Sequence, residues 1–427
     1  MIKFDTTLGT YQPAFFRMKV NAGTIDYSKW NSREWSVFFH EYVHFLQDCM
    51  TVSGLNNIYY INEYIREIAT NYAQKTPFHV PVELIDNNNN VKLNRLLNNL
   101  TAGDDRDPFS PLTICGVDVK NYTDSVLMSA GVSFIQEVVL QTNNGECRFG
   151  RREIMESMAY ILQRLCTEID YTSPEYPYCT AEKVSKHICH NGFADDLLNI
   201  VALCDIALMT SNPCAVFVDY LYQIQQGQLT VSKPEDLYDD FYAKKCCFNG
   251  TEQTVIECFK GYSERAKNAL KSYVDIEYIN NTLYKWIDHT FDKALKIREN
   301  DRYFFLELAI GGNSLKDNKK FIEIFNSIGS PLVKNINNKY FRFPSNPDYG
   351  DTFQYLCAIS TIRNIFSGKF KCSMIDFCEQ SSGKTGITVN QFCNHAPWRR
   401  CNDKQLCPVA LILKHRKLAS NEPVLRK

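Results

Sequence analysis

The chain has 427 residues, of which 44% are hydrophobic, and this is enough material for a substantial core spread over two or three domains. Its 47 basic and 48 acidic residues nearly cancel, so the overall charge gives no reason to expect nucleic acid or an anionic membrane as a partner. The N-terminus lacks the pattern of a signal peptide, and no uncharged apolar stretch approaches the roughly 18 residues that cross a bilayer. We therefore expect a soluble, cytoplasmic protein whose 17 cysteines are mostly reduced.

The first part of the chain predicts a strand followed by two helices. Residues 11–20 alternate in the manner of a strand. A helix is predicted over residues 34–50 with Ser32 as its N-cap, because this segment has neither Gly nor Pro and is apolar almost all round, as in a buried helix. Gly54 then separates it from a second predicted helix at residues 55–72.

The middle of the chain predicts an exposed insertion and several further elements. Residues 85–108 are rich in Asn and Asp, and we expect them to form an exposed excursion or lid. A short strand is predicted at residues 112–119. Helical periodicity then returns in three segments, at residues 124–140, 152–168 and 195–209.

The remainder of the chain predicts more helices and then a segment of different character, which carries six cysteines among turn residues. Together these patterns predict a mainly α-helical fold with a small β-sheet, of the α+β class. We expect a core at residues 1–230 with an insertion at about 76–145, a helical region at residues 231–345 and a cysteine-rich segment at residues 346–427.

Three residues of the first predicted helix carry the clearest chemical signal. Side chains four residues apart project from one face of an α-helix, so His40 and His44 can place two imidazole nitrogens on one tetrahedral metal ion. Glu41 points beside that ion, where its carboxylate can accept a proton from the water that the metal activates. Burying three ionisable side chains in an apolar helix is costly without such a partner. The spacing predicts a Zn²⁺ site with Glu41 as general base.

The residues around this motif resemble a known family. The segment His40–Gln47, followed by Gly54, is similar to the active-site helix of the zincin metallopeptidases. The metzincin branch has a further histidine close behind, whereas the next histidine in this chain is His79. The gluzincin branch instead takes a glutamate from a second helix, and residues 150–159 resemble its Glu-x-x-Ala segment. The resemblance implies a zincin-like core with a gluzincin type of metal site.

The same resemblance implies Glu156 as the third metal ligand. Glu153 lies one helical turn earlier on the same side and competes for this role, or accepts a hydrogen bond from the other nitrogen of a ligand histidine. The separation from His44 is 156 − 44 = 112 residues, longer than in compact members of the family. An inserted lid between the two helices would account for this length.

Gluzincins also stabilise the tetrahedral oxyanion with a Tyr or His donor. The resemblance leaves five candidates open: Tyr160, Tyr171, Tyr178, His187 and His190. The last two, three residues apart, also leave a second metal pair open. We expect a substrate to pair with a sheet edge, and the candidate strand is Phe15–Val20.

The C-terminal cysteines offer a separate alternative. Cys393 and His395, with Cys401, Cys407, Cys372 and Cys378, include enough ligands for a structural zinc ion. Their spacing is poor for this purpose, because structural zinc sites favour paired ligands two to four residues apart. Free thiols remain the simpler interpretation.

The sequence as a whole predicts a zinc metallopeptidase, most simply an endopeptidase that hydrolyses protein or peptide substrates. Restraint by the Asn-rich excursion or the C-terminal segment, relieved by a regulatory partner, is a further hypothesis. Two other classes stay open. One is a scaffold or binding protein that keeps zinc for stability without turnover, and the other is a zinc hydrolase of non-peptide amides or a protease with a single target.

Overall fold

The fold is mainly helical with small sheets, as expected, and a computed structural model describes residues 9–73, 77–82, 89–169, 171–248, 250–273, 277–312, 314–343, 354–419 and 421–425. Its helices are α1 (Ser32–Met50), α2 (Val52–Tyr72), α3 (Asn89–Thr101), α4 (Ser125–Ser129), α5 (Arg151–Cys166), α6 (Glu175–Tyr178), α7 (Thr180–Ile188), α8 (Leu197–Leu208), α9 (Pro213–Gln225), α10 (Glu235–Ala243), α11 (Val255–Tyr273), α12 (Glu277–Asn300), α13 (Phe304–Ile310), α14 (Lys319–Ile328), α15 (Gln354–Phe366), α16 (Ile375–Thr385), α17 (Phe392–His395) and α18 (Pro408–His415). Its strands are β1 (Gly9–Gln12), β2 (Arg17–Val20), β3 (Phe78–Val80), β4 (Ile114–Tyr122), β5 (Ile135–Thr142), β6 (Gly145–Phe149), β7 (Lys245–Phe248), β8 (Thr251–Thr254), β9 (Leu332–Lys334), β10 (Tyr340–Phe341) and β11 (Pro423–Leu425).

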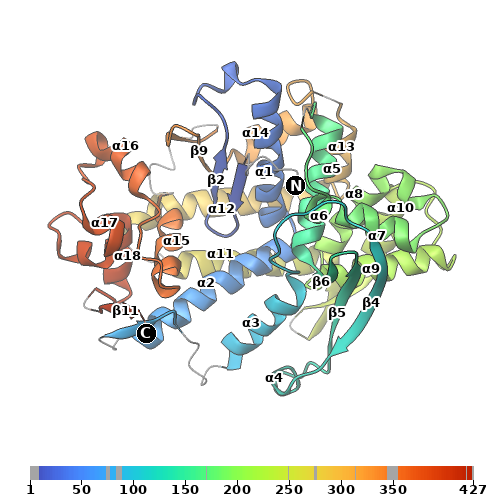
Figure 1. Cartoon of the computed structure of the whole chain (residues 1–427), viewed down its shortest axis with the longest axis horizontal. Coiled ribbons are helices and arrows are strands. Elements are labelled where there is room, and N and C mark those ends of the chain that lie inside the picture. Colours follow the sequence, from blue (N-terminus) through green and yellow to red (C-terminus); the bar gives the residue numbers. More distant parts are fainter. Residues whose placement is uncertain are drawn as a thin grey trace.

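Helix α1 is the central helix of the structure (Figure 1). Its N-cap is Asn31 and not Ser32 as predicted, because the Asn31 side chain accepts a hydrogen bond from the Glu34 backbone N–H. The Glu34 carboxylate in turn accepts from the Asn31 N–H, which completes a capping box. From Ser36 to Met50 every residue is buried, as the apolar sequence predicts. The helix therefore forms part of the core on all sides.

The sheet next to α1 differs from the sequence prediction. Residues 11–20 do not form one strand, because β1 and β2 pair antiparallel as a hairpin. Strand β2 also pairs parallel with β9, and β9 pairs antiparallel with β10. The expectation that Phe15–Val20 offers a sheet edge is therefore wrong, since β2 has a neighbour on each side. The outermost strand at this end of the described sheet is β1.

Helices α2 and α5 pack against α1, and Gly54 allows the closest of these contacts. Gly54 lies in the first turn of α2 and does not separate two helices by a loop, since Thr51 alone lies between α1 and α2. A Cβ atom at position 54 would lie 2.3 Å from the Gln47 carbonyl oxygen and 2.5 Å from the Asp48 Cα. Both contacts are with backbone, which cannot rotate away.

Replacing Gly54 by alanine is therefore expected to destabilise the protein by about 1–3 kcal/mol, since α2 must move away from α1. Chemical denaturation of the two proteins measures this difference. Gly383→Ala in helix α16 is the matched control, because a Cβ there meets nothing within 4 Å. Equal stability of Gly54→Ala and Gly383→Ala would show that the close contact is absent.

Four other sequence predictions are resolved by the described residues. The strand at 112–119 and the helices at 152–168 and 195–209 are confirmed as β4, α5 and α8. The helix predicted at 124–140 is wrong. Only the short α4 is helical there, and β5 pairs with both β4 and β6, because its β-branched residues precede a tight turn that ends at Gly145.

The predicted excursion at residues 85–108 is partly helical. Residues 89–101 of it form α3, and a loop that packs against α5 follows, whereas residues 85–88 of the Asn-rich stretch lie outside the described residues. The C-terminal cysteines, expected among turns, lie on or beside α15 to α18 and the 3-10 turn Pro397–Asn402. Helix formation in this segment buries six thiols: Cys357, Cys372, Cys378, Cys393, Cys401 and Cys407.

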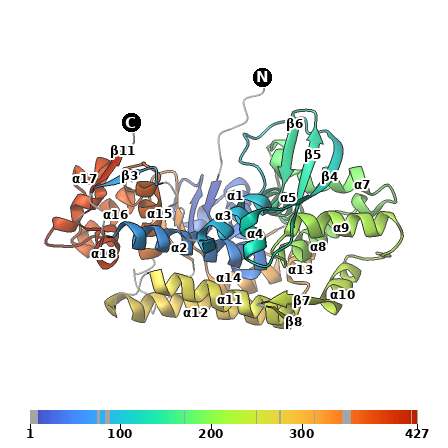
Figure 2. The same cartoon turned by 90° about the horizontal axis from the view of Figure 1, so that it is seen from below.

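Later parts of the chain support the N-terminal helices. Helices α11 and α12 run side by side along one side of the molecule, and α11 packs along α2 (Figure 2). The guanidinium of Arg298 on α12 donates to the Met50 carbonyl at the end of α1 and forms a fully buried ion pair with Asp205 on α8. Strand β11 pairs with β3 across most of the chain length. The division into three regions at residues 230 and 345 stays a prediction. The contacts described in this paragraph cross both of these boundaries.

Within the described part of the chain, no helix combines the length and apolar character that a membrane crossing requires.

Candidate metal centre

Three potential ligand atoms from α1 and α5 converge on one point. The Nε2 atoms of His40 and His44 lie 3.2 Å apart, and the Oε2 atom of Glu156 lies 3.2 Å from each of them. No other group of three His, Cys, Asp or Glu ligand atoms comes as close within the residues that the structure describes. The structure thus brings together the three ligands that the sequence and the zincin resemblance predict.

These separations fit a tetrahedral metal ion. Bonds of about 2.0–2.2 Å from a tetrahedral zinc to nitrogen and oxygen place neighbouring ligand atoms about 3.3–3.6 Å from each other. The two histidine side chains are only 10% exposed, whereas that of Glu156 is 25% exposed. Three protein ligands with one side open to solvent is the arrangement of a catalytic rather than a structural zinc site.

Gln47 fixes the orientation of one ligand and joins it to the second helix. Its Oε1 lies 2.8 Å from Nδ1 of His44, so it accepts the Nδ1–H and leaves Nε2 with a free lone pair. Its Nε2 donates to the Met155 carbonyl at 3.1 Å, next to Glu156. The sequence did not predict this role for Gln47, although its position one helical turn after His44 is consistent with it.

Glu41 lies beside the three ligand atoms and beneath strand β1. Its carboxyl group is not one of the three converging groups. A Cβ atom at Gly9 would lie 2.6 Å from Glu41 Oε1, so the strand backbone passes directly over this side chain. Neither β1 as a separate strand nor this contact was predictable from the sequence. The sequence does not indicate why residue 9 is glycine, because Gly9 and Glu41 come together only in the folded chain.

The charges of the centre influence one another strongly. Burial raises the pKa of Glu41 to about 8, and the nearby Glu156 carboxylate adds to this effect. Burial lowers the pKa of His40. Burial alone would lower the pKa of His44 too, but Glu156 outweighs it and raises that pKa to about 9. The pKa of Glu156 falls well below its ordinary value, since both histidines outweigh its burial. Glu156 is thus kept as a carboxylate, the form that binds a cation.

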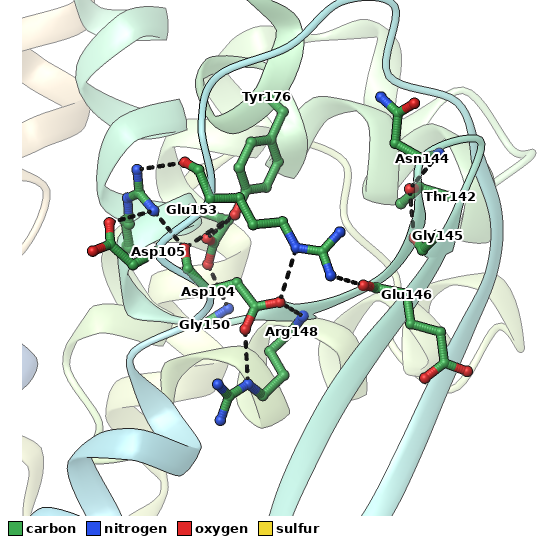
Figure 3. Close-up of polar contacts among 12 residues, drawn as sticks. Asp104, Asp105, Thr142, Asn144, Gly145, Glu146, Arg148, Gly150, Glu153 and Tyr176 are labelled. Carbon is green, nitrogen blue, oxygen red and sulfur yellow. Dashed lines mark hydrogen bonds and ion pairs between the residues drawn. The ribbon is translucent and has the colours of Figure 1, made fainter.

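Glu153, the competitor for the third ligand, does not point at the centre. Its Oε2 accepts the Gly150 N–H at 2.9 Å, and its Oε1 accepts the Tyr176 hydroxyl at 2.8 Å (Figure 3). This carboxyl group therefore closes the first turn of α5. Its oxygens accept from Gly150 and Tyr176, and neither accepts an N–H from His40 or His44, so the alternative role as acceptor for a ligand histidine is not seen.

The loop before β4 packs closely around this carboxyl group. A Cβ at Gly150 would lie 2.2 Å from the Gly103 nitrogen, and Gly103 has a φ of +90°, which favours glycine. Asp104 accepts from the Arg148 backbone N–H and forms an ion pair with its guanidinium at 2.9 Å (Figure 3). The loop thus sets the start of α5, and with it the height at which Glu156 faces α1.

Glu153 is expected to make stability depend on pH. Burial raises its pKa from 4.5 to about 7, so the folded state favours the neutral form. The stabilising contribution is complete below about pH 4.5 and is lost as the pH rises through 7, by about 3 kcal/mol in all. Glu153→Gln should remove this slope. Denaturation of both proteins at pH 5 and pH 8 measures it, and parallel pH profiles would contradict the assignment.

Tyr178 is the oxyanion candidate that the structure places nearest the ligands. Its ring centroid lies 5.6 Å from that of His40, and burial raises the pKa of its hydroxyl, with Glu156 and Glu41 adding to the effect. This hydroxyl makes no hydrogen bond within the described residues. The hydroxyl of Tyr171 instead accepts from Gln163, and Tyr160 packs beside Tyr178 at 5.8 Å between ring centroids.

The remaining sequence candidates are not at this centre. His187 lies in the last turn of α7 and is partly exposed, and His190 is exposed just beyond it. Neither joins a cluster of three ligands within the described chain. The C-terminal thiols form no such cluster either. The Arg400 guanidinium donates to Cys393 Sγ at 3.1 Å, and this positive charge opposes a second cation there.

No protein-family model, curated protein or solved structure matches this chain. The zincin resemblance therefore stays a prediction.

Proposed function

We propose that the chain is a zinc-dependent peptidase of gluzincin type. The observation that carries this proposal is the approach to 3.2 Å of three ligand atoms from two helices that lie 112 residues (156 − 44) apart in the sequence. The open side at Glu156 and the adjacent Glu41 favour a catalytic site over a purely structural one.

The roles of the chain's own residues follow from their places. His40, His44 and Glu156 would hold the ion, which when bound supplies Lewis-acid polarisation of a carbonyl and a water of lowered pKa. Glu41 accepts the proton of the attacking water and returns it to the leaving amine. Tyr178 donates its hydroxyl hydrogen to the oxyanion that develops on the scissile carbonyl. The nucleophile is water, so no acyl-enzyme forms.

Strand β1 is the proposed binding edge for the substrate backbone. It replaces the strand at Phe15–Val20, which is covered on both sides. Because β1 passes over Glu41, a peptide added alongside it as a further strand would run past the reactive groups. Recognition through backbone hydrogen bonds favours extended, unfolded segments of protein substrates.

The test is digestion of a library of unstructured peptides, with new termini read by mass spectrometry. The zinc-loaded chain should cleave the library, the chain stripped with 1,10-phenanthroline should not, and zinc should restore cleavage. His187→Ala serves as the matched control and should cleave as wild type does. Stoichiometric zinc without any cleavage would favour the scaffold alternative, and absence of bound zinc would refute the proposal.

Tyr178→Phe is expected to lower kcat/KM by about 100-fold, because it removes one donor to the developing oxyanion. Zinc content should not change, since Tyr178 is not one of the three ligands. Initial rates on one cleaved peptide measure the effect. Tyr171→Phe is the control, because the Tyr171 hydroxyl already accepts a hydrogen bond from Gln163. Similar rates for the two variants would assign the donor elsewhere.

We also propose that the protein acts in the cytoplasm, where peptides and unfolded proteins are available. The proposal is supported by the seventeen cysteines, each of which is a free thiol.

A further inference from the structure

The β7–β8 hairpin and helix α11 bring two cysteine sulfurs into direct contact. The Sγ atom of Cys246 on β7 lies 2.8 Å from the Sγ atom of Cys258 on α11. A disulfide bond is about 2.0 Å long, so these sulfurs need to approach by only ~0.8 Å to bond. The two cysteines are 12 positions apart in the sequence (258 − 246), and a movement of this size requires no rearrangement of the fold.

The contact is part of a regular interface. Residues two apart in a strand share a face, and so do residues four apart in a helix. Cys246 and Phe248 face α11, where they meet Cys258 and Tyr262, and the Phe248 and Tyr262 ring centroids are 4.7 Å apart. A Cβ at Gly261 would lie 2.4 Å from the Phe248 ring, so glycine at this position lets the hairpin approach the helix closely.

We propose that Cys246 and Cys258 are a covalent modification site, at which exchange with a small disulfide such as oxidised glutathione forms an intramolecular disulfide. The Cys246 thiolate attacks one sulfur of the small disulfide and releases one thiol. The Cys258 thiolate then attacks the Cys246 sulfur and releases the second thiol. Two protein S–H bonds and one S–S bond are lost, and one protein S–S bond and two small-molecule thiols are formed.

The different solvent exposure of Cys246 and Cys258 indicates the order of these two steps. Cys246 is partly exposed, whereas Cys258 is only 4% exposed, so a molecule from solvent reaches Cys246 first. Burial, with the contact to Cys246, raises the pKa of Cys258 to about 12, which makes it a weak nucleophile towards solvent species. Cys258 acts on the neighbouring sulfur instead, where proximity compensates for this low reactivity.

Cys247 and Cys115 provide comparisons within the same chain. Cys247 adjoins Cys246 but is exposed, and its side chain alternates away from α11. Cys115 is exposed on β4 and makes no contact with another sulfur in the described residues. Both should stop at the mixed disulfide with glutathione, because neither side chain faces Cys258.

The test uses the full chain, reduced, desalted and incubated with oxidised glutathione at pH 8. After an acid quench, free thiols are alkylated and the digest is mapped by mass spectrometry. We expect a cross-linked pair of peptides that joins residues 246 and 258 and has lost two hydrogens, with glutathione on Cys115. The cross-link should persist in Cys247→Ser, and Cys258→Ser should retain glutathione at Cys246.

Alkylated or glutathione-bearing Cys246 and Cys258 in the wild-type chain, without the cross-linked peptide, would overturn the proposal. A cross-link from Cys247 to Cys258 would do so as well, since it requires a different register of the hairpin on α11. Mapping of the wild-type chain alone decides between these outcomes, so the result does not depend on how the variants fold.

Discussion

Glu41→Gln is expected to lower turnover of a cleaved peptide by about 10²–10⁴-fold, while zinc remains bound at one ion per chain. Glutamine has nearly the shape of glutamate but cannot accept the proton of the attacking water at neutral pH. The converging ligand atoms belong to His40, His44 and Glu156, so their geometry is retained. Steady-state kinetics on a fluorogenic peptide and metal analysis of the same sample provide the two measurements.

The control for this experiment is Glu63→Gln on α2, which also removes one helical carboxylate but pairs with Arg66 away from the ligands. It should retain wild-type turnover. Unchanged turnover in Glu41→Gln, with zinc bound, would remove Glu41 from the mechanism. Loss of zinc in Glu41→Gln would show instead that this carboxylate supports the ion.

Arg298→Met is expected to destabilise the protein by about 3–5 kcal/mol, because it leaves the Asp205 carboxylate buried without a counter-charge. The side chains of Arg298 and Asp205 are both 0% exposed, and Tyr238 donates to Asp205 at 3.0 Å. Arg298 also donates to the Met50 carbonyl at 2.9 Å, so its loss weakens the end of α1. Equilibrium denaturation measures the change in unfolding free energy.

Two variants separate this effect from the removal of any arginine. Arg302→Met breaks an ion pair with Asp239 whose side chains are 41% and 52% exposed, and such pairs contribute at most about 1 kcal/mol. The double variant Arg298→Met with Asp205→Leu should recover much of the lost stability, because no buried charge remains. Equal losses from Arg298→Met and Arg302→Met would contradict the buried ion pair.

The part of the site that lies within one helix was predictable from the sequence. His40, Glu41 and His44 follow from the geometry of a single helix, which needs no knowledge of the rest of the fold. Glu156 came from the resemblance, and the sequence could not separate it from Glu153, which is one turn away. The choice depends on how α5 is rotated against α1, and contacts such as Gly150 with Gly103 set that rotation.

The sheet was less predictable, because its partners are distant in the sequence. Strand β2 lies between β1 and β9, and β9 comes about 300 residues later, so no local pattern showed that Phe15–Val20 is covered. The helix prediction for residues 124–140 was wrong for a different reason. Their apolar spacing satisfies a helix as well as a strand, and pairing with β4 and β6 decided in favour of the strand β5.

Gln47 gives the proposed enzyme a direct link between its metal and its fold. One amide group holds the His44 ring and the α5 backbone, so separating the two helices also turns a ligand away from the ion. Under the proposed function, a shortage of zinc would then weaken the packing of α1 against α5. The zinc supply would thus determine the stability of the folded chain as well as its catalytic rate.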